Sequence, residues 1–181
     1  MTRSSLFALA LLASLPALAA DPVFIAATPD GGHAAIRGYD AVAYFTDGKP
    51  VLGKPEFAFV WQGAEWRFAS AAHRAAFERE PARYAPAFGG YCAYGASNGY
   101  KVSTDPDAFA IEGGKLYLNY SIPVANTWNK DRPGYIAKAT RLWATLVDEP
   151  YETDDDSVAK AQAKPVSAPA SSAPPAAGGG K

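Results

Sequence analysis

The chain contains very few side chains that bind soft metals. Its 181 residues include one cysteine, two histidines and one methionine. A single cysteine excludes a disulfide within the chain, a zinc site of four thiolates and a haem-attachment motif, and a single methionine excludes a methionine-rich copper tract. Any metal chemistry therefore depends on a small number of residues.

An excess of either charge is also lacking. Lys and Arg together number 17 and Asp and Glu number 18, which gives a net charge of -1. A neutral protein has no general attraction for polyanions, so we expect no nucleic-acid partner. Glycine-rich phosphate-binding motifs are absent as well. The composition, 49% hydrophobic with 13% aromatic residues, is typical of a folded globular chain.

The N-terminus has the pattern of a secretory signal peptide. A short basic start at Met1-Thr2-Arg3 precedes an apolar run over residues 6–15 and an Ala-Leu-Ala ending. A membrane anchor or buried helix is the alternative, but a spanning helix needs about 20 apolar residues. We expect cleavage after Ala19, with Ala20 as the neighbouring choice. The mature protein is then periplasmic or secreted, without a transmembrane anchor.

The C-terminus has too few large apolar side chains to fold. Residues 151–181 are rich in Ala, Pro and Ser and end in a run of glycines. Such a composition cannot offset the entropy lost on ordering, so we predict a disordered tail. Residues 20–150 remain as one domain, in which no internal repeat is apparent.

Two β-hairpins are predicted within this domain. Aromatic-rich runs at residues 57–61 and 65–69 flank a turn-prone link. A second pair of strands is expected at residues 108–111 and 115–120, across Glu112-Gly113-Gly114. In the last strand the alternation places Leu116 and Leu118 on one face and Tyr117 and Asn119 on the other.

Helices are predicted after the strands. Ser70 suits the N-cap of a helix over residues 71–79, because its hydroxyl can accept from an unpaired amide of the first turn. Apolar residues at helical spacing predict a last helix over residues 134–146. Strand pairs followed by helices indicate a small single-domain α+β fold.

Few residues could carry chemistry. Cys92 lies in a glycine-flanked segment, and His33 and His73 are the two imidazoles that could act with it. No signature for a third, orienting group accompanies them, so a catalytic pair is not indicated. A buried free thiol is the plainer interpretation of Cys92. The aromatics could stack on a ligand, but Trp61 and Trp66 fall where core packing is expected.

Several motifs together resemble the YHS domain family, and more narrowly the exported, stand-alone YHS-domain proteins of bacteria. The resemblance covers about residues 35–143. It is carried by Gly38-Tyr39-Asp40-Ala41-Val42-Ala43-Tyr44-Phe45, the hairpin end Trp66-Arg67-Phe68-Ala69-Ser70, His73, Phe77, Pro81, Tyr84, the segment from Tyr84 to Ala93, and Gly114-Lys115-Leu116-Tyr117-Leu118-Asn119-Tyr120.

The resemblance implies a metal-binding module, since such domains occur attached to heavy-metal transporting ATPases. None of the motifs is catalytic, so an enzyme is not indicated. The family's three cysteine positions correspond here to Ala43, Ala69 and His73. Alanine ligates nothing, so the family's usual site cannot form in this chain.

Two interpretations follow for the site. In one, the fold has lost its metal. In the other, a relocated site uses His73 and Cys92, with help from Asp40, Tyr39 or Tyr91. In the second case we expect a copper or zinc handling module, because a small nitrogen and sulfur ligand set suits copper and, with an added carboxylate, zinc. In the first we expect a metal-free binding or scaffold module for another exported protein or a small apolar ligand. A redox role for Cys92 alone is a third alternative.

Overall fold

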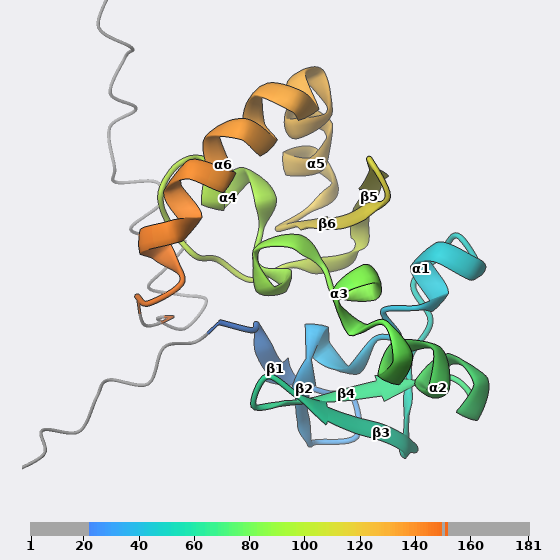
Figure 1. The fold of residues 1–181 in the computed structure, drawn as a ribbon. Helices are drawn as coiled ribbons and strands as arrows, with labels where there is room; N and C mark the ends of the chain where they lie inside the picture. Colours follow the sequence, from blue (N-terminus) through green and yellow to red (C-terminus); the bar gives the residue numbers. More distant parts are fainter. Residues whose placement is uncertain (1–21, 150, 152–181) are drawn as a thin grey trace, which may run out of the picture.

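The computed structural model describes residues 22–149 and residue 151. The predicted signal peptide, residues 1–19, lies outside the described residues, as does all of the predicted tail except Tyr151. Helices and short antiparallel strand pairs make up the fold, which confirms the α+β class. Figure 1 shows two lobes, one built from the elements before residue 85 and the other from the elements after it.

The first lobe combines two strand pairs with short helices. Its elements are β1 (Ile25–Ala27), β2 (His33–Ala35), the 3-10 helix η1 (Ile36–Gly38), α1 (Ala43–Thr46), β3 (Lys54–Trp61), β4 (Ala64–Phe68), α2 (Ala71–Arg79) and α3 (Pro81–Tyr84). Strands β1 and β2 pair antiparallel, as do β3 and β4. Ser70 caps α2 as predicted, because its hydroxyl accepts from the backbone N–H of His73 at 3.1 Å.

The second lobe contains one hairpin and the longest helix. Its elements are the 3-10 helix η2 (Ala87–Gly90), α4 (Ala93–Ser97), β5 (Asp105–Glu112), β6 (Lys115–Asn119), α5 (Ile122–Trp128), the 3-10 helix η3 (Asn129–Asp131) and α6 (Arg132–Leu146). Strands β5 and β6 are antiparallel. The side chain of Asp131 caps α6 by accepting from the N–H of Gly134, so this helix begins two residues before the predicted start.

The two lobes repeat one order of elements, although no internal repeat is apparent from the sequence. The first repeat, residues 36–84, runs η1-α1-β3-β4-α2-α3, and the second repeat, residues 87–146, runs η2-α4-β5-β6-α5-α6 with η3 before its last helix. From the hairpins onward matched positions lie 51 residues apart, since strands β3 and β5 begin at Lys54 and Asp105. Before the hairpins the offset is 52, as between Gly38 and Gly90. Both hairpins also shift register over their first four residues.

Both hairpins turn through two residues at positive φ. Gln62 and Gly63 have φ values of 50° and 75°, and Gly113 and Gly114 have values of 56° and 75°. Positive φ at both central residues is the mark of the type I′ turn, whose twist matches that of paired strands. Each turn is thus one residue shorter than the sequence predicts. Strands β3 and β5 also begin before the predicted starts at residues 57 and 108.

Strand β6 joins the two halves of the core. Leu116 and Leu118 pack in the cluster of the first lobe, with Trp66, Phe68 and Phe77. Tyr117 packs in the cluster of the second lobe, with Phe88 and Trp128. The predicted alternation of these side chains is confirmed, and it places apolar cores on both faces of the strand.

Candidate ligand cleft

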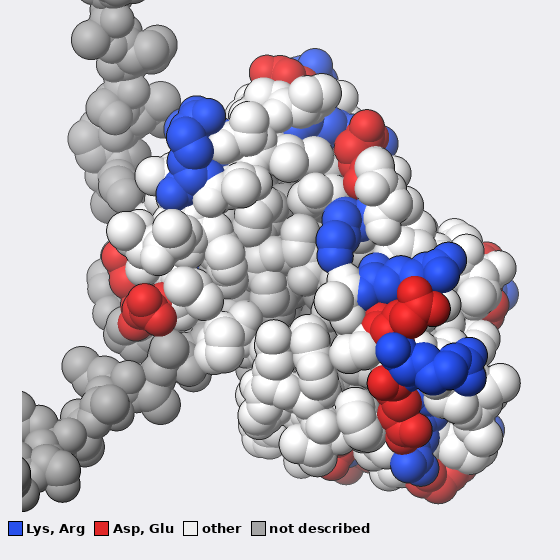
Figure 2. All heavy atoms as spheres, viewed as in Figure 1, with Lys and Arg blue, Asp and Glu red and all other residues white. Residues whose placement is uncertain are grey.

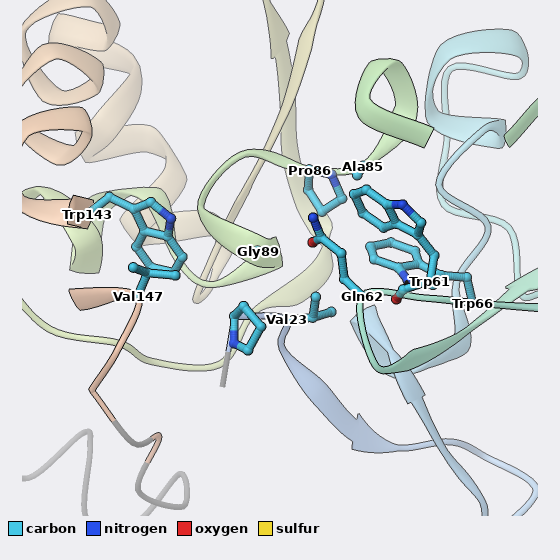
Figure 3. Close-up of a pocket in the computed structure, with 10 residues that line it drawn as sticks. Val23, Trp61, Gln62, Trp66, Ala85, Pro86, Gly89, Trp143 and Val147 are labelled. Atoms are coloured by element: carbon cyan, nitrogen blue, oxygen red, sulfur yellow. Dashed lines mark hydrogen bonds between the residues drawn. The ribbon is translucent and has the colours of Figure 1, made fainter. Parts of the chain in front are cut away.

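A cavity of about 550 Å³ opens between the two lobes, and we call it the tryptophan cleft. Its volume falls in the usual range for small-molecule sites, about 300–1,000 Å³. Figure 3 shows the two tryptophans of the first hairpin facing the tryptophan of α6 across it. The cleft is lined by Pro22, Val23, Trp61, Gln62, Trp66, Ala85, Pro86, Gly89, Trp143 and Val147.

One wall is the β3–β4 hairpin. Trp61 and Trp66 lie edge to face with ring centroids 5.8 Å apart, and the indole N–H of Trp66 donates to the carbonyl of Trp61 at 3.1 Å. Phe77 of α2 supports both rings from behind, with centroids 5.7 Å and 5.0 Å away. Edge-to-face pairs add about 0.5–1.5 kcal/mol each beyond the area they bury, so this wall is rigid before any ligand arrives.

The opposite wall is the last turn of α6. Trp143 packs against Phe88 and Tyr91, with ring centroids 5.8 Å and 6.1 Å away. The buried ammonium of Lys101 lies 5.7 Å from the centre of the Trp143 ring and donates to the carbonyls of Val147 and Glu149. Lys101 therefore fixes both the ring and the end of the helix that carries it.

The floor is formed where the N-terminal segment crosses the link between the lobes. The backbone N–H of Phe24 donates to the carbonyl of Gly89 at 2.9 Å. Gly89 has a φ of 62°, and a Cβ at this position would lie 1.9 Å from the carbonyl oxygen of Pro22. Only glycine allows this approach, so Gly89 lets the N-terminal segment lie directly against the link between the lobes.

No described residue that lines the cleft carries a charge. Gln62 is the lining residue with an amide side chain, and in Figure 3 that side chain extends from the hairpin turn toward Pro86. Figure 2 shows charged groups of both signs gathered over the side of the molecule that carries α2 and α3, while the surface between the lobes is almost entirely uncharged. The cleft therefore suits a neutral molecule.

Asp40 and His73, two of the predicted metal ligands, lie together in the first lobe. Asp40 is fully buried, and one of its oxygens is 2.6 Å from Nδ1 of His73. The same carboxylate accepts from the backbone N–H groups of Val42 and Ala43 at the start of α1, and from Ala69 before α2. His73 keeps a 20% exposed side chain, and its Nε2 is 3.5 Å from the hydroxyl of Thr46.

Cys92, the third predicted ligand, belongs to the second lobe. Its sulfur accepts from the backbone N–H groups of Gly95 and Tyr120, each at 3.3 Å, and donates to Oδ1 of Asn119 at 3.7 Å. Burial raises the pKa of the Cys92 thiol, and hydrogen bonds from the backbone oppose that shift. The thiol is thus a protonated core group at neutral pH, and its sulfur caps α4.

The structure does not bring Cys92 together with His73 and Asp40. Within residues 22–149 and residue 151, no three His, Cys, Asp or Glu side chains are close enough to hold a metal ion. The partners of Cys92 and those of His73 are also different residues. The metal role inferred from the sequence stays a prediction, and in the described residues it has no shared site.

The sequence does not show which aromatic residues line a ligand site and which pack only in the core. The sequence predicts core packing for Trp61 and Trp66. Trp66 is indeed buried, yet both rings also form a wall of the cleft. The cleft draws on four separate segments of the chain, so no local pattern could reveal it. One local signal existed, because Gln62 occupies a turn position that favours Asn or Gly.

Comparisons with known proteins found no match to a family model, to a curated protein or to a solved structure. The resemblance to YHS domains therefore remains a prediction. In the part of the chain that the structure describes, no helix has the length and apolar character needed to cross a membrane.

Proposed function

We propose that this protein is a binding module that holds a small, neutral, planar molecule in the tryptophan cleft. The observation that carries the proposal is that three of the four tryptophans of the chain surround one cavity of about 550 Å³. This is the metal-free alternative considered from the sequence, with a small apolar ligand as its occupant.

The physical basis is stacking and desolvation. Indole rings bind flat apolar molecules through large contact areas with little loss of side-chain entropy. The rings of Trp66 and Trp143 are already held by hydrogen bonding and packing, so binding does not need to order them. An uncharged lining adds no penalty from an unpaired buried charge.

The test uses N-phenyl-1-naphthylamine, a neutral dye whose fluorescence rises in apolar sites. We expect saturable binding of one dye per chain. Trp143→Ala removes one wall and should weaken the affinity about tenfold, which corresponds to about 1.4 kcal/mol. Val147→Lys places a charge at the rim and should also weaken binding. Trp128→Phe is the matched control, because Trp128 is buried in the second-lobe cluster and does not line the cleft.

Two results would contradict the proposal. One is the absence of saturable dye binding by the folded protein. The other is equal affinity in wild type, Trp143→Ala and Val147→Lys, which would locate the dye elsewhere. Circular dichroism of each variant separates loss of the cleft from loss of the fold.

A second candidate function is transition-metal binding through His73. The contact between Asp40 and His73 favours it, because metal-binding histidines commonly donate their second ring N–H to a carboxylate. Nε2 of His73 would then be the ligand atom, with copper or zinc as the ion. Stoichiometric uptake of Cu²⁺ or Zn²⁺ that His73→Ala abolishes would support this candidate, and unchanged uptake in that variant would exclude it.

Export is part of the same proposal and is supported by the sequence of residues 1–20. The test is expression with the native N-terminus followed by mass measurement of the periplasmic and secreted fractions. A mature chain beginning at Ala20 or Asp21 is expected. Recovery of the full-length chain from the cytoplasm alone would contradict it.

A further inference from the structure

We propose that Gln62 selects, for the tryptophan cleft, flat aromatic ligands that carry a neutral carbonyl or carboxamide group. This rests on the proposed function, since it assigns the ligand class of the same cleft. Three features of Gln62 carry it: a backbone conformation unfavourable for its residue type, the direction of its side chain, and an exposed amide that is available to a ligand.

The backbone of Gln62 is in the left-handed region, with a φ of 50°. A side chain is disfavoured there, because Cβ crowds the backbone. The second repeat makes the same turn with Gly113, at a φ of 56°, and so avoids the crowding. Glycine can therefore occupy this turn position, as Gly113 does in the second hairpin. In the first hairpin the position is occupied by Gln62, whose side chain reaches the cleft. Unfavourable conformations of this kind gather at binding sites.

The side chain of Gln62 extends into the space between the two walls (Figure 3). Gln62 is exposed, and its carboxamide is open to solvent and free to turn toward a ligand. The indole N–H of Trp66 is already used by the carbonyl of Trp61. Gln62 is therefore the lining side chain that can both donate and accept toward a ligand.

The ligand class follows from this chemistry. A carboxamide pairs well with a second carboxamide or with a carbonyl, giving one or two neutral hydrogen bonds. A ligand carboxylate would find no cation among the described lining residues, and its desolvation would be uncompensated. An aromatic ring without polar groups would stack on the tryptophans but would gain no hydrogen bond from Gln62.

Three probes of one shape separate these cases: naphthalene, 2-naphthamide and 2-naphthoate. Their affinities are measured by displacement of N-phenyl-1-naphthylamine. We expect wild type to bind 2-naphthamide about fivefold more tightly than naphthalene, as one net hydrogen bond provides. We expect 2-naphthoate to bind more weakly than 2-naphthamide by at least a similar factor.

The variants isolate the carboxamide. Gln62→Met keeps the length of the side chain but cannot donate, and Gln62→Gly reproduces the residue of the second repeat. Both should bring the affinities for 2-naphthamide and naphthalene to about the same value, with naphthalene binding little changed. Gly113→Gln is the control, because it places the same side chain in the equivalent turn of β5 and β6, which does not line the cleft. It should leave the preference intact.

Two results overturn the role of Gln62: equal binding of the three probes to wild type, or a preference for 2-naphthamide over naphthalene that survives in Gln62→Met. In either case, saturable binding of the dye still supports the tryptophan cleft as a binding site. Failure of the dye and of all three probes to bind wild type overturns both.

Discussion

Asp40 and Cys92 occupy equivalent positions in the two repeats. Each follows a Gly-Tyr pair whose glycine has positive φ. Each side chain also accepts a hydrogen bond from a backbone N–H at the start of the short helix that comes after it. The carboxylate of Asp40 also accepts from the N–H of Ala69, and the sulfur of Cys92 accepts from the N–H of Tyr120, 51 positions later. The two predicted metal ligands therefore share one structural role, which is to tie a helix start to the end of a hairpin.

Asp40→Ala should destabilise the protein strongly. It leaves three backbone N–H groups and an imidazole without their buried acceptor. Because each unsatisfied buried group costs about 1–3 kcal/mol, we expect a loss of at least about 3 kcal/mol in the free energy of unfolding. Urea titration measures it. His73→Ala removes one donor and should cost far less, so equal losses in the two variants would contradict this account.

Cys92 should make stability fall at alkaline pH. Burial raises the pKa of its thiol above the ordinary value of 9.0, so the unfolded chain releases this proton first. The contribution of the thiol is fully present below pH 9 and is lost as the pH rises from there toward the pKa of the folded state, by up to about 1.4 kcal/mol per pH unit. Urea titrations between pH 8 and 10 should show this fall in wild type. Cys92→Ser should flatten it, and the same slope in that variant would be evidence against the thiol.

Trp128→Phe should cost little although Trp128 is fully buried. Its indole N–H has no hydrogen-bond partner in the described part of the chain, so phenylalanine removes an unsatisfied donor. Phe77 occupies the matching position of the first repeat, 51 residues earlier. We expect a change within about 1 kcal/mol, against a loss of about 3–5 kcal/mol for Trp128→Ala. Similar losses in the two variants would mean that the indole N–H is satisfied.

Gly89→Ala should disturb the floor of the cleft. The new Cβ would overlap the carbonyl of Pro22 and would lie at a φ of 62°. We expect a loss of at least about 2 kcal/mol in the free energy of unfolding, from backbone strain and the displaced N-terminal segment. Gly48→Ala is the matched control, since Gly48 also has positive φ but has no atom within 4 Å of an added Cβ. If the two variants lose equal stability, strain alone accounts for the effect.

Local structure was predictable where neighbours in the chain determine it. Both hairpins, the Ser70 cap and the last helix follow from turns, side-chain caps and apolar spacing, and each was found with shifts of a few residues. The internal repeat is hard to detect in the sequence. Only scattered matched positions are identical, such as the Gly-Tyr pairs and the capping residues Ser70 and Ser121. Others differ, such as Asp40 and Cys92, and their equivalence lies in hydrogen bonds.

The α+β class, the two longer hairpins, the helix after Ser70, the last helix and the scarcity of metal ligands all follow from the amino-acid sequence. The strand pair β1–β2 and the helices α1, α4 and α5 do not, and neither does the choice of side chains that meet. Packing of the two repeats around β6 brings Trp61 and Trp143 to one cleft and leaves His73 and Cys92 in separate lobes. The physical reason is that turns and caps are local interactions, whereas proximity between distant residues depends on how complete hydrophobic faces are buried against one another.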